Sequence, residues 1–319
     1  MSKVMIKKIM FIAVLAAAWP AQAQERYPSR PVEFIVPFGP GGGADQLARK
    51  VARLLEPELK VSVPAVNVPG ATGGTGMAKL VAAPADGYSM AIYIADTHAL
   101  LATTANPRWK NDDLVPLGIM IRQPSALFVK TDSPWKTWND VAKAAKASPG
   151  KLKVAVVGLG SVDEMALKYM EGKGLKFTAV PYAKPGERYT AILGGHADLL
   201  YEQPGDVRSF LDSKQIRAIL IFNQKRVPEF ADVMSSKEAR LEVYLPQFRS
   251  VVVRAGTDPQ RVKILADAVA KVAADPEYYA FLKDSLALRD SFIPAAKAKQ
   301  FLDGELAVME KFASQSKKQ

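Results

Sequence analysis

The sequence contains no cysteine and only two histidines, His98 and His196. Without cysteine there is no disulfide framework, so the fold must rest on a hydrophobic core, and a hydrophobic content of 49% is sufficient for one. Transition-metal sites are built mainly from Cys, His and carboxylate side chains, so the same shortages argue against a metal centre. The two histidines are expected to be structural.

Blocks of like charge are also missing, although the formal net charge is +11. Lysine and arginine are scattered along the chain and are not interleaved with aromatic residues, so nucleic acid is not an expected partner. The positive surplus is most simply a solvated basic surface. Mild steering of anionic solutes toward the protein is the alternative.

Long apolar runs are missing after the first 23 residues, so no later stretch is expected to cross a membrane. Residues 1–23 combine lysines at positions 3, 7 and 8, a short apolar run over 9–19 and the sequence Ala21-Gln22-Ala23. The run is shorter than the roughly 20 residues that span a bilayer, which favours a secretory signal peptide over a membrane anchor. We therefore predict cleavage after Ala23 and an exported protein that starts at Gln24.

The first part of the mature chain alternates between strand-like and helix-like segments. Apolar runs predict strands at 32–37, 60–66 and within ADGYSMAIYIA. Apolar residues at positions 47, 51, 54 and 55 share one face and predict a helix over 44–59. The segment NVPGATGGTGMAKLVAA predicts a glycine-rich turn that enters another helix. This alternation indicates a doubly wound α/β domain.

The pattern restarts after Gln123 and predicts a second α/β unit that interrupts the first. Strands are predicted at 126–130, 153–157, 177–182, 198–201 and 218–221, and helices at 138–147 and 162–171. Asp-Pro pairs at 258 and 275 each combine a helix N-cap with proline at the first helical position, so the chain ends in helices, the last over about 294–312. We predict a division into residues 24–122, 123–246 and 247–319, the last returning to the first unit.

Two glycine-rich loops, at 37–45 and 158–164, each join a strand to a helix, one in each unit. The first N–H groups of a helix lack partners within the helix and lie at the positive end of its dipole, so a carboxylate is a natural ligand there. Open α/β sheets bind ligands at the carboxyl ends of their strands, where both loops lie. Two such ends facing each other across a cleft would hold a small acid at two points.

Enzyme motifs are weaker than this pair of loops. Gly39, Gly41 and Ala44 fit the G-x-G-x-x-G/A dinucleotide fingerprint, but the acid expected about 20 residues later is missing from VSVPAVNVPG. The sequence has no G-K-[ST] of a P-loop, and GLGSV is not the G-x-S-x-G of a hydrolase. An exported α/β enzyme therefore stays an alternative, below a binding protein.

Six sequence blocks follow one another over essentially all of the mature chain: YPSRPVEFIVPFGPGGGADQLAR, NVPGATGGTGMAKL, ADGYSMAI, GLGSVDEMA, PYAKPGERYTAILGGHADLLY and VRAGTDPQRV. In this order they resemble the periplasmic substrate-binding receptors of tripartite tricarboxylate transporters, the Bug-type receptors. The resemblance implies a type II-like periplasmic-binding-protein fold, with two doubly wound α/β domains joined by crossover strands. It implies a monomeric periplasmic receptor without catalysis or cofactor, which delivers a small organic acid to a membrane permease.

The resemblance also implies where the acid is held. One carboxylate would meet backbone groups of the first loop, partly through water, and the second loop would form the other grip, with further residues lining the cleft. The expected ligand-binding residues are Phe38, Gly41, Gly42, Gly43, Asp45, Thr97, Gly160, Ser161, Glu164 and Asp198.

Two positions depart from the family pattern: Ala44 stands where threonine is usual, and Glu164 where histidine is usual. A histidine can donate to a carboxylate, whereas an ionised glutamate only accepts, so the usual dicarboxylate is in doubt as the ligand. Ser161 and Glu164 also fit an S-x-x-E capping box, so Glu164 either contacts the solute or only caps its helix. Asp45 has the same helix-capping alternative, and Asp198 that of a strand-end turn residue. A sensor domain that feeds a regulatory partner would share this binding chemistry.

Overall fold

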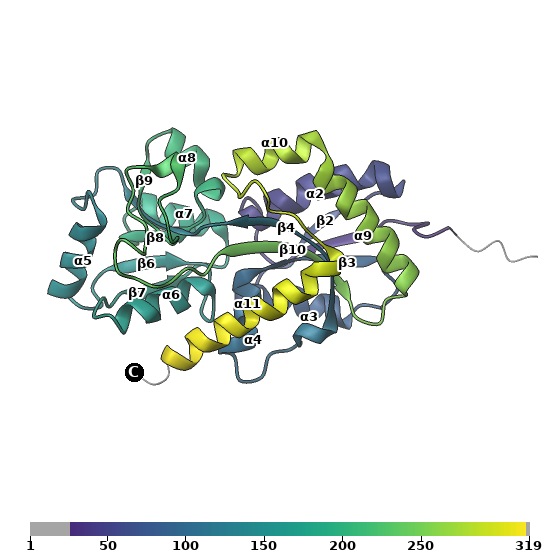
Figure 1. The fold of residues 1–319 in the computed structure, drawn as a ribbon, viewed down its shortest axis with the longest axis horizontal. Helices are drawn as coiled ribbons and strands as arrows, with labels where there is room; N and C mark the ends of the chain where they lie inside the picture. Colours follow the sequence, from purple (N-terminus) through teal and green to yellow (C-terminus); the bar gives the residue numbers. More distant parts are fainter. Residues whose placement is uncertain (1–25, 317–319) are drawn as a thin grey trace, which may run out of the picture.

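The structure is a computed structural model that describes residues 26–316 (Figure 1). The predicted signal peptide, residues 1–23, and the predicted first mature residue, Gln24, therefore lie outside the described residues. Within the part of the chain that the structure describes, every helix is too short or too polar to span a bilayer.

The first lobe is built on a six-stranded sheet. Its strands are β1 (Glu33–Val36), β2 (Ala65–Asn67), β3 (Ser89–Ile94), β4 (Leu114–Gln123), β10 (Gln247–Arg254) and β11 (Ile293–Pro294). Its helices are α2 (Gly43–Leu59), α3 (Gly74–Ala82), α4 (Ala95–Thr103), α9 (Pro259–Ala274), α10 (Pro276–Asp284) and α11 (Ala295–Ser316). The strand order is β11-β4-β10-β3-β1-β2, with β1 parallel to β2 and β3, and β10 antiparallel to β3 and β4. Helices α2, α9 and α10 cover one face of this sheet, and α3, α4 and α11 cover the other (Figure 1).

The second lobe is built on a five-stranded sheet. Its strands are β5 (Ala126–Lys130), β6 (Lys153–Val156), β7 (Thr178–Pro181), β8 (Leu199–Glu202) and β9 (Ile216–Ile221). Its helices are α5 (Trp138–Ala147), α6 (Val162–Glu171), α7 (Pro185–Leu193) and α8 (Arg208–Asp212). The strand order is β7-β6-β8-β5-β9, with β6 parallel to β7 and β8, and β5 antiparallel to β8 and β9.

Two crossings connect the lobes. The chain passes from β4 directly into β5 and returns from β9 to β10, and β4 and β10 pair antiparallel from Gln247 opposite Gln123 to Arg254 opposite Leu114. Helix α11 adds a third link, because it runs from the first lobe toward α6 (Figure 1) and its Phe312 ring lies 5.6 Å from the Tyr169 ring of α6. The loops at the ends of β1 and β6 are therefore held facing each other by a continuous framework.

The strand–loop–helix segments predicted around both glycine-rich loops are confirmed. Several other elements were not predicted from the sequence. The long strand β4 contains Pro116 and Gly118, which are unfavourable inside a strand, and Pro116 lies at a register shift against β10. Helix α4 follows β3 directly, so Thr97, which we expected on a loop after the third strand, lies in the first turn of a helix. The second predicted strand was too long, since β2 covers three residues.

His98 is a structural residue of the first lobe. Its ring is fully buried, with Nδ1 2.8 Å from the Tyr93 hydroxyl and Nε2 2.9 Å from the carbonyl oxygen of Leu302 in α11. Burial lowers the pKa of His98 to about 4, so the ring is neutral at physiological pH. The ring therefore ties α4 to α11 and does not reach the cleft.

Candidate functional site

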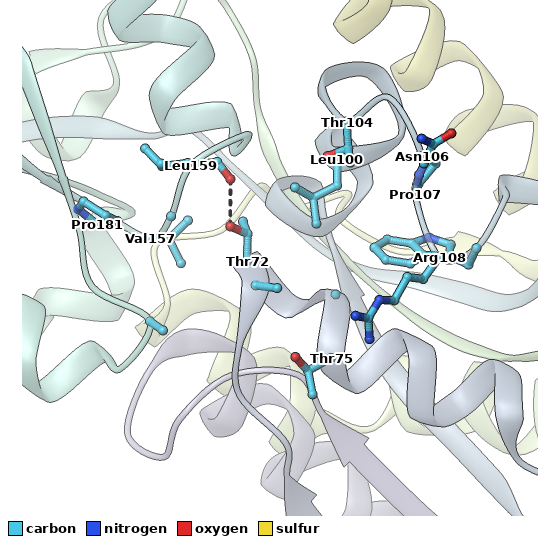
Figure 2. Close-up of a pocket in the computed structure, with 15 residues that line it drawn as sticks. Thr72, Thr75, Leu100, Thr104, Asn106, Pro107, Arg108, Val157, Leu159 and Pro181 are labelled. Atoms are coloured by element: carbon cyan, nitrogen blue, oxygen red, sulfur yellow. Dashed lines mark hydrogen bonds between the residues drawn. The ribbon is translucent and has the colours of Figure 1, made fainter.

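The two glycine-rich loops meet between the lobes, which are closed against each other. The Thr72 hydroxyl, in the turn before α3, donates to the Leu159 carbonyl oxygen at 2.8 Å (Figure 2). Beside it, the Thr103 hydroxyl of α4 donates to the Gly160 carbonyl oxygen at 2.9 Å. These bonds join the second lobe's loop to the first lobe.

The first loop is shaped by Asp45 in the first turn of α2. Its carboxylate accepts from the Gly41 N–H at 3.0 Å and from Asn67 Nδ2 at 2.9 Å, and pairs with Arg49. Burial opposes ionisation, but these hydrogen bonds prevail and lower the pKa of Asp45. Gly41 has φ +85°, a conformation that favours glycine. In this arrangement Asp45 builds the loop and contacts β2.

The second loop is shaped by a cap on α6. Ser161 Oγ accepts from the Glu164 N–H at 3.2 Å and donates to the Gly158 carbonyl oxygen at 2.6 Å. The Glu164 carboxylate accepts from the Gly160 N–H at 2.6 Å and pairs with Lys168 at 3.0 Å. Ser161 therefore caps α6 as expected, but the second half of the expected capping box does not form, because Glu164 accepts from the Gly160 N–H and not from the Ser161 N–H.

A small cavity of about 30 Å³, the inner cavity, lies between the two loops. The predicted site residues differ in whether they line this cavity. Phe38, Gly42 and Gly43 line it. Thr97 is fully buried in the first lobe, and its hydroxyl donates to the Thr72 carbonyl oxygen at 3.1 Å. Asp198 is not brought to the cavity: its carboxylate accepts from the Lys153 N–H at 2.8 Å, at the start of β6, whereas the loop leaves the other end of that strand.

The charged lining of this cavity was not predicted from the sequence. Its six charged residues come from six different elements of the two lobes: Asp96, Asp163, Arg188, Glu202, Asp206 and Arg249. Two of these residues stand out in the sequence, because each is a charged residue in a strand that also contains a run of apolar residues. Glu202 ends the otherwise apolar strand LLYE, and Arg249 interrupts the buried strand QFRSVVVR.

Both guanidinium groups are buried in ion pairs. Arg188 of α7 pairs with Glu202, which also accepts from the Tyr189 hydroxyl at 3.0 Å. Arg249 of β10 forms a two-point pair with Asp206, which lies in the turn after β8, so this pair joins the two lobes. In the described part of the chain, Arg188 Nε and Arg249 Nε are buried without a hydrogen-bond acceptor.

Each of the two helix N-termini faces a carboxylate from the opposite lobe. The Val162 N–H, at the start of α6, donates to Asp96 Oδ1 of the first lobe at 3.1 Å. A Cβ atom added to Gly43, at the start of α2, would overlap the Asp206 carboxylate of the second lobe. Burial raises the pKa of Asp96 to about 6, and burial together with the Asp96 charge raises the pKa of Asp163 well above its usual range.

A larger cavity of about 510 Å³, the outer cavity, is lined by Thr72 and Leu159 (Figure 2). Both lobes line it, the first through Leu100 and Trp109 and the second through Pro181. The exposed Arg108 side chain lies at its edge. The outer cavity is therefore mainly apolar and the inner one is highly charged.

Comparison with known proteins agrees with the sequence blocks. A family model described as tripartite tricarboxylate transporter family receptor matches residues 47–308. A UPF0065 protein from the gbd 5' region of Cupriavidus necator is 30% identical over 283 residues, covering 86% of this chain and 83% of that protein. Protein BugT of Bordetella pertussis is 28% identical over 262 residues, 80% of each chain.

The fold is also similar to that of solved periplasmic binding proteins. The solved structure of MatC from Rhodopseudomonas palustris with bound malate superposes with a TM-score of 0.84 at 23% identity, over 90% of this chain and 100% of that one. The expected two-lobed periplasmic-binding-protein fold and the expected family are thereby confirmed. The chain belongs to the tripartite tricarboxylate transporter receptor family.

Proposed function

We propose that the protein is a periplasmic receptor that captures a small organic acid between its lobes and delivers it to the permease of a tripartite transporter. Residues 24–122 and 247–319 would form one closing body and residues 123–246 the other. The family's role supports the transport function, and MatC, which has the same fold, holds malate.

The observation that carries the proposal is the inner cavity. One side of it is formed by the N-terminus of α2 at Gly42 and Gly43, where the helix dipole is positive. The guanidinium groups of Arg188 and Arg249 also line it, and each keeps one buried N–H group without an acceptor. A carboxylate of the solute would supply the missing acceptor at this side.

The small volume of the inner cavity supports a closed arrangement of the two lobes. About 30 Å³ holds one water-sized group, so a solute can enter only when the lobes stand further apart than they do here. We expect binding and closure to be coupled, with the chain opening and closing about the crossings between β4 and β5 and between β9 and β10.

A thermal-shift screen of mono-, di- and tricarboxylates and aromatic acids tests this function. An acid present at 100 times its dissociation constant should stabilise the protein by about 2.7 kcal/mol. Uptake of that acid by cells should be lost when the gene is deleted and restored by the wild-type gene. A protein that no organic acid stabilises, or uptake that does not depend on the gene, would contradict the proposal.

A further inference from the structure

The charges around the inner cavity do not balance. Four carboxyl groups and two guanidinium groups line it, and both guanidinium groups are already engaged, Arg188 with Glu202 and Arg249 with Asp206. Asp96 and Asp163 therefore remain, and neither forms an ion pair with any residue of the described range 26–316. Both side chains are almost fully buried, at 3% exposure each.

The hydrogen bonds of these two carboxyl groups come from neutral donors. Asp96 accepts from Gln247 Nε2 at 2.6 Å and from the Val162 N–H, and Asp163 accepts from the Val157 N–H at 2.9 Å. Neutral donors do not cancel charge, and two buried carboxylates near each other repel. The raised pKa values of both groups reflect this unfavourable environment for negative charge.

We infer that the solute carries a protonated nitrogen in addition to its carboxylate, and that Asp96 and Asp163 bind this nitrogen. The inference rests on the proposed receptor function and names the class of its ligand. The Arg188 charge also acts on both aspartates, but its guanidinium is already paired with Glu202, so a protonated amine placed beside Asp96 and Asp163 would supply the ion-pair partner that they lack. The carboxylate of the same solute would accept from Arg188 Nε and Arg249 Nε, which belong to residues lining the cavity and are buried without a hydrogen-bond partner.

A plain dicarboxylate fits this lining less well. It would bring two further negative charges into a cavity that already holds two carboxyl groups without an ion-pair partner in the described chain. The N-terminus of α6, which would bind the second carboxylate, already faces Asp96 through the Val162 N–H.

Matched pairs of acids that differ in one amino group test the inference by titration calorimetry at pH 7. The pairs are propionate and L-alanine, succinate and L-aspartate, and butyrate and 4-aminobutyrate. In the pair that binds best, we expect the amine-bearing acid to bind at least ten times more tightly. If an acid without nitrogen binds equally well or better, the inference is wrong and the receptor function stands. If no acid of these pairs binds and no acid of the thermal-shift screen stabilises the protein, the receptor function is wrong and the inference falls with it.

Variants show whether Asp163 is responsible for the preference. Asp163→Asn keeps an oxygen that can accept from the Val157 N–H, so it should fold, and the preference should fall below about threefold. Glu171→Gln is the matched control, because it removes one negative charge from the far end of the same helix, where Glu171 pairs with the exposed Lys176. Asp96→Asn gives a second test if Asp163→Asn lowers stability. An unchanged preference in both aspartate variants would overturn the assignment.

Discussion

Closure of the lobes depends on the absence of a side chain at Gly42, the residue before α2. A Cβ atom at this position would lie 3.1 Å from Pro185 Cβ of the second lobe and closer still to Pro185 Cγ. Carbon atoms in ordinary contact are about 3.5–4.0 Å apart, so an alanine would push the lobes about an ångström or more apart at this point. Gly42 has φ −86°, which any residue adopts, so Gly42→Ala does not strain its own backbone.

The size of the effect follows from the cost of such an overlap. Extra carbon atoms in a well-packed contact cost about 1–3 kcal/mol. Since the overlap exists in the closed state and disappears in the open state, the cost should be seen as weaker binding. At about 1.4 kcal/mol for each factor of ten, the dissociation constant should rise about 5- to 140-fold.

Calorimetry with the acid that gives the largest thermal shift measures this change, and small-angle X-ray scattering should show a larger radius of gyration without added acid. Gly186→Ala is the matched control: it lies beside Pro185 in α7, and a Cβ there would meet nothing within 4 Å apart from its chain neighbours and the backbone of its own helix. Pro185→Ala in the Gly42→Ala background removes the closest overlapping atom and should recover part of the affinity. Wild-type affinity and an unchanged radius in Gly42→Ala would refute the reasoning.

Three further predictions concern stability, measured by urea unfolding. Ser161→Ala removes the cap of α6 and should lower the free energy of unfolding by about 0.5–2 kcal/mol; no change would mean that the cap is dispensable. Arg249→Met leaves the buried Asp206 without its partner and should cost about 3–5 kcal/mol, most of it recovered when Asp206→Leu is added; equal losses in the single and double variants would contradict this. Acidification from pH 6.5 to 4 should lower the free energy of unfolding by up to about 3 kcal/mol through His98, whose pKa of about 4 lies below the ordinary value of 6.5. Over the same range Asp96 should raise the free energy of unfolding by a similar amount, because its pKa of about 6 lies above the ordinary value of 3.8. Asp96→Asn should therefore lose stability more steeply than wild type over this range, and parallel curves would show that Asp96 does not titrate as stated.

The parts of the fold that sequence reasoning found are those in which local patterns decide the structure. The segment that leads from β1 through the glycine loop into α2 has an apolar run, a turn that needs glycine and one apolar helix face. The segment from β6 into α6 adds Ser161 as a cap, and the structure shows that cap. Such features depend on residues within about ten positions of one another, so they can be read from a single sequence.

Strand β4 shows where local patterns mislead. Pro116 and Gly118 argue against a strand when the segment is taken by itself. In the structure β10 pairs with β4 along its length, and a register shift in this pairing accommodates Pro116 and Gly118. Asp198 shows the same limit for the site. Its position next to an apolar strand is consistent with a cleft residue, but the direction of β8 places it at the amino end of the sheet, beside Lys153.

The charged cavity could not be derived from the sequence, because its charged residues come from different elements. Their contacts also depend on residues far along the chain. Asp96 lies 66 positions before Val162, and Asp206 lies 43 positions before Arg249. Reasoning from the sequence treats a helix N-terminus as an open anion site, since its N–H groups lack partners within the helix. At α6 the tertiary structure brings the protein's own carboxylate to that position, so the same local geometry that predicts an anion site instead holds Asp96 in place next to Asp163. The ligand preference of this receptor therefore depends on which carboxylates the opposite lobe presents to each helix, and not on the glycine-rich loops alone.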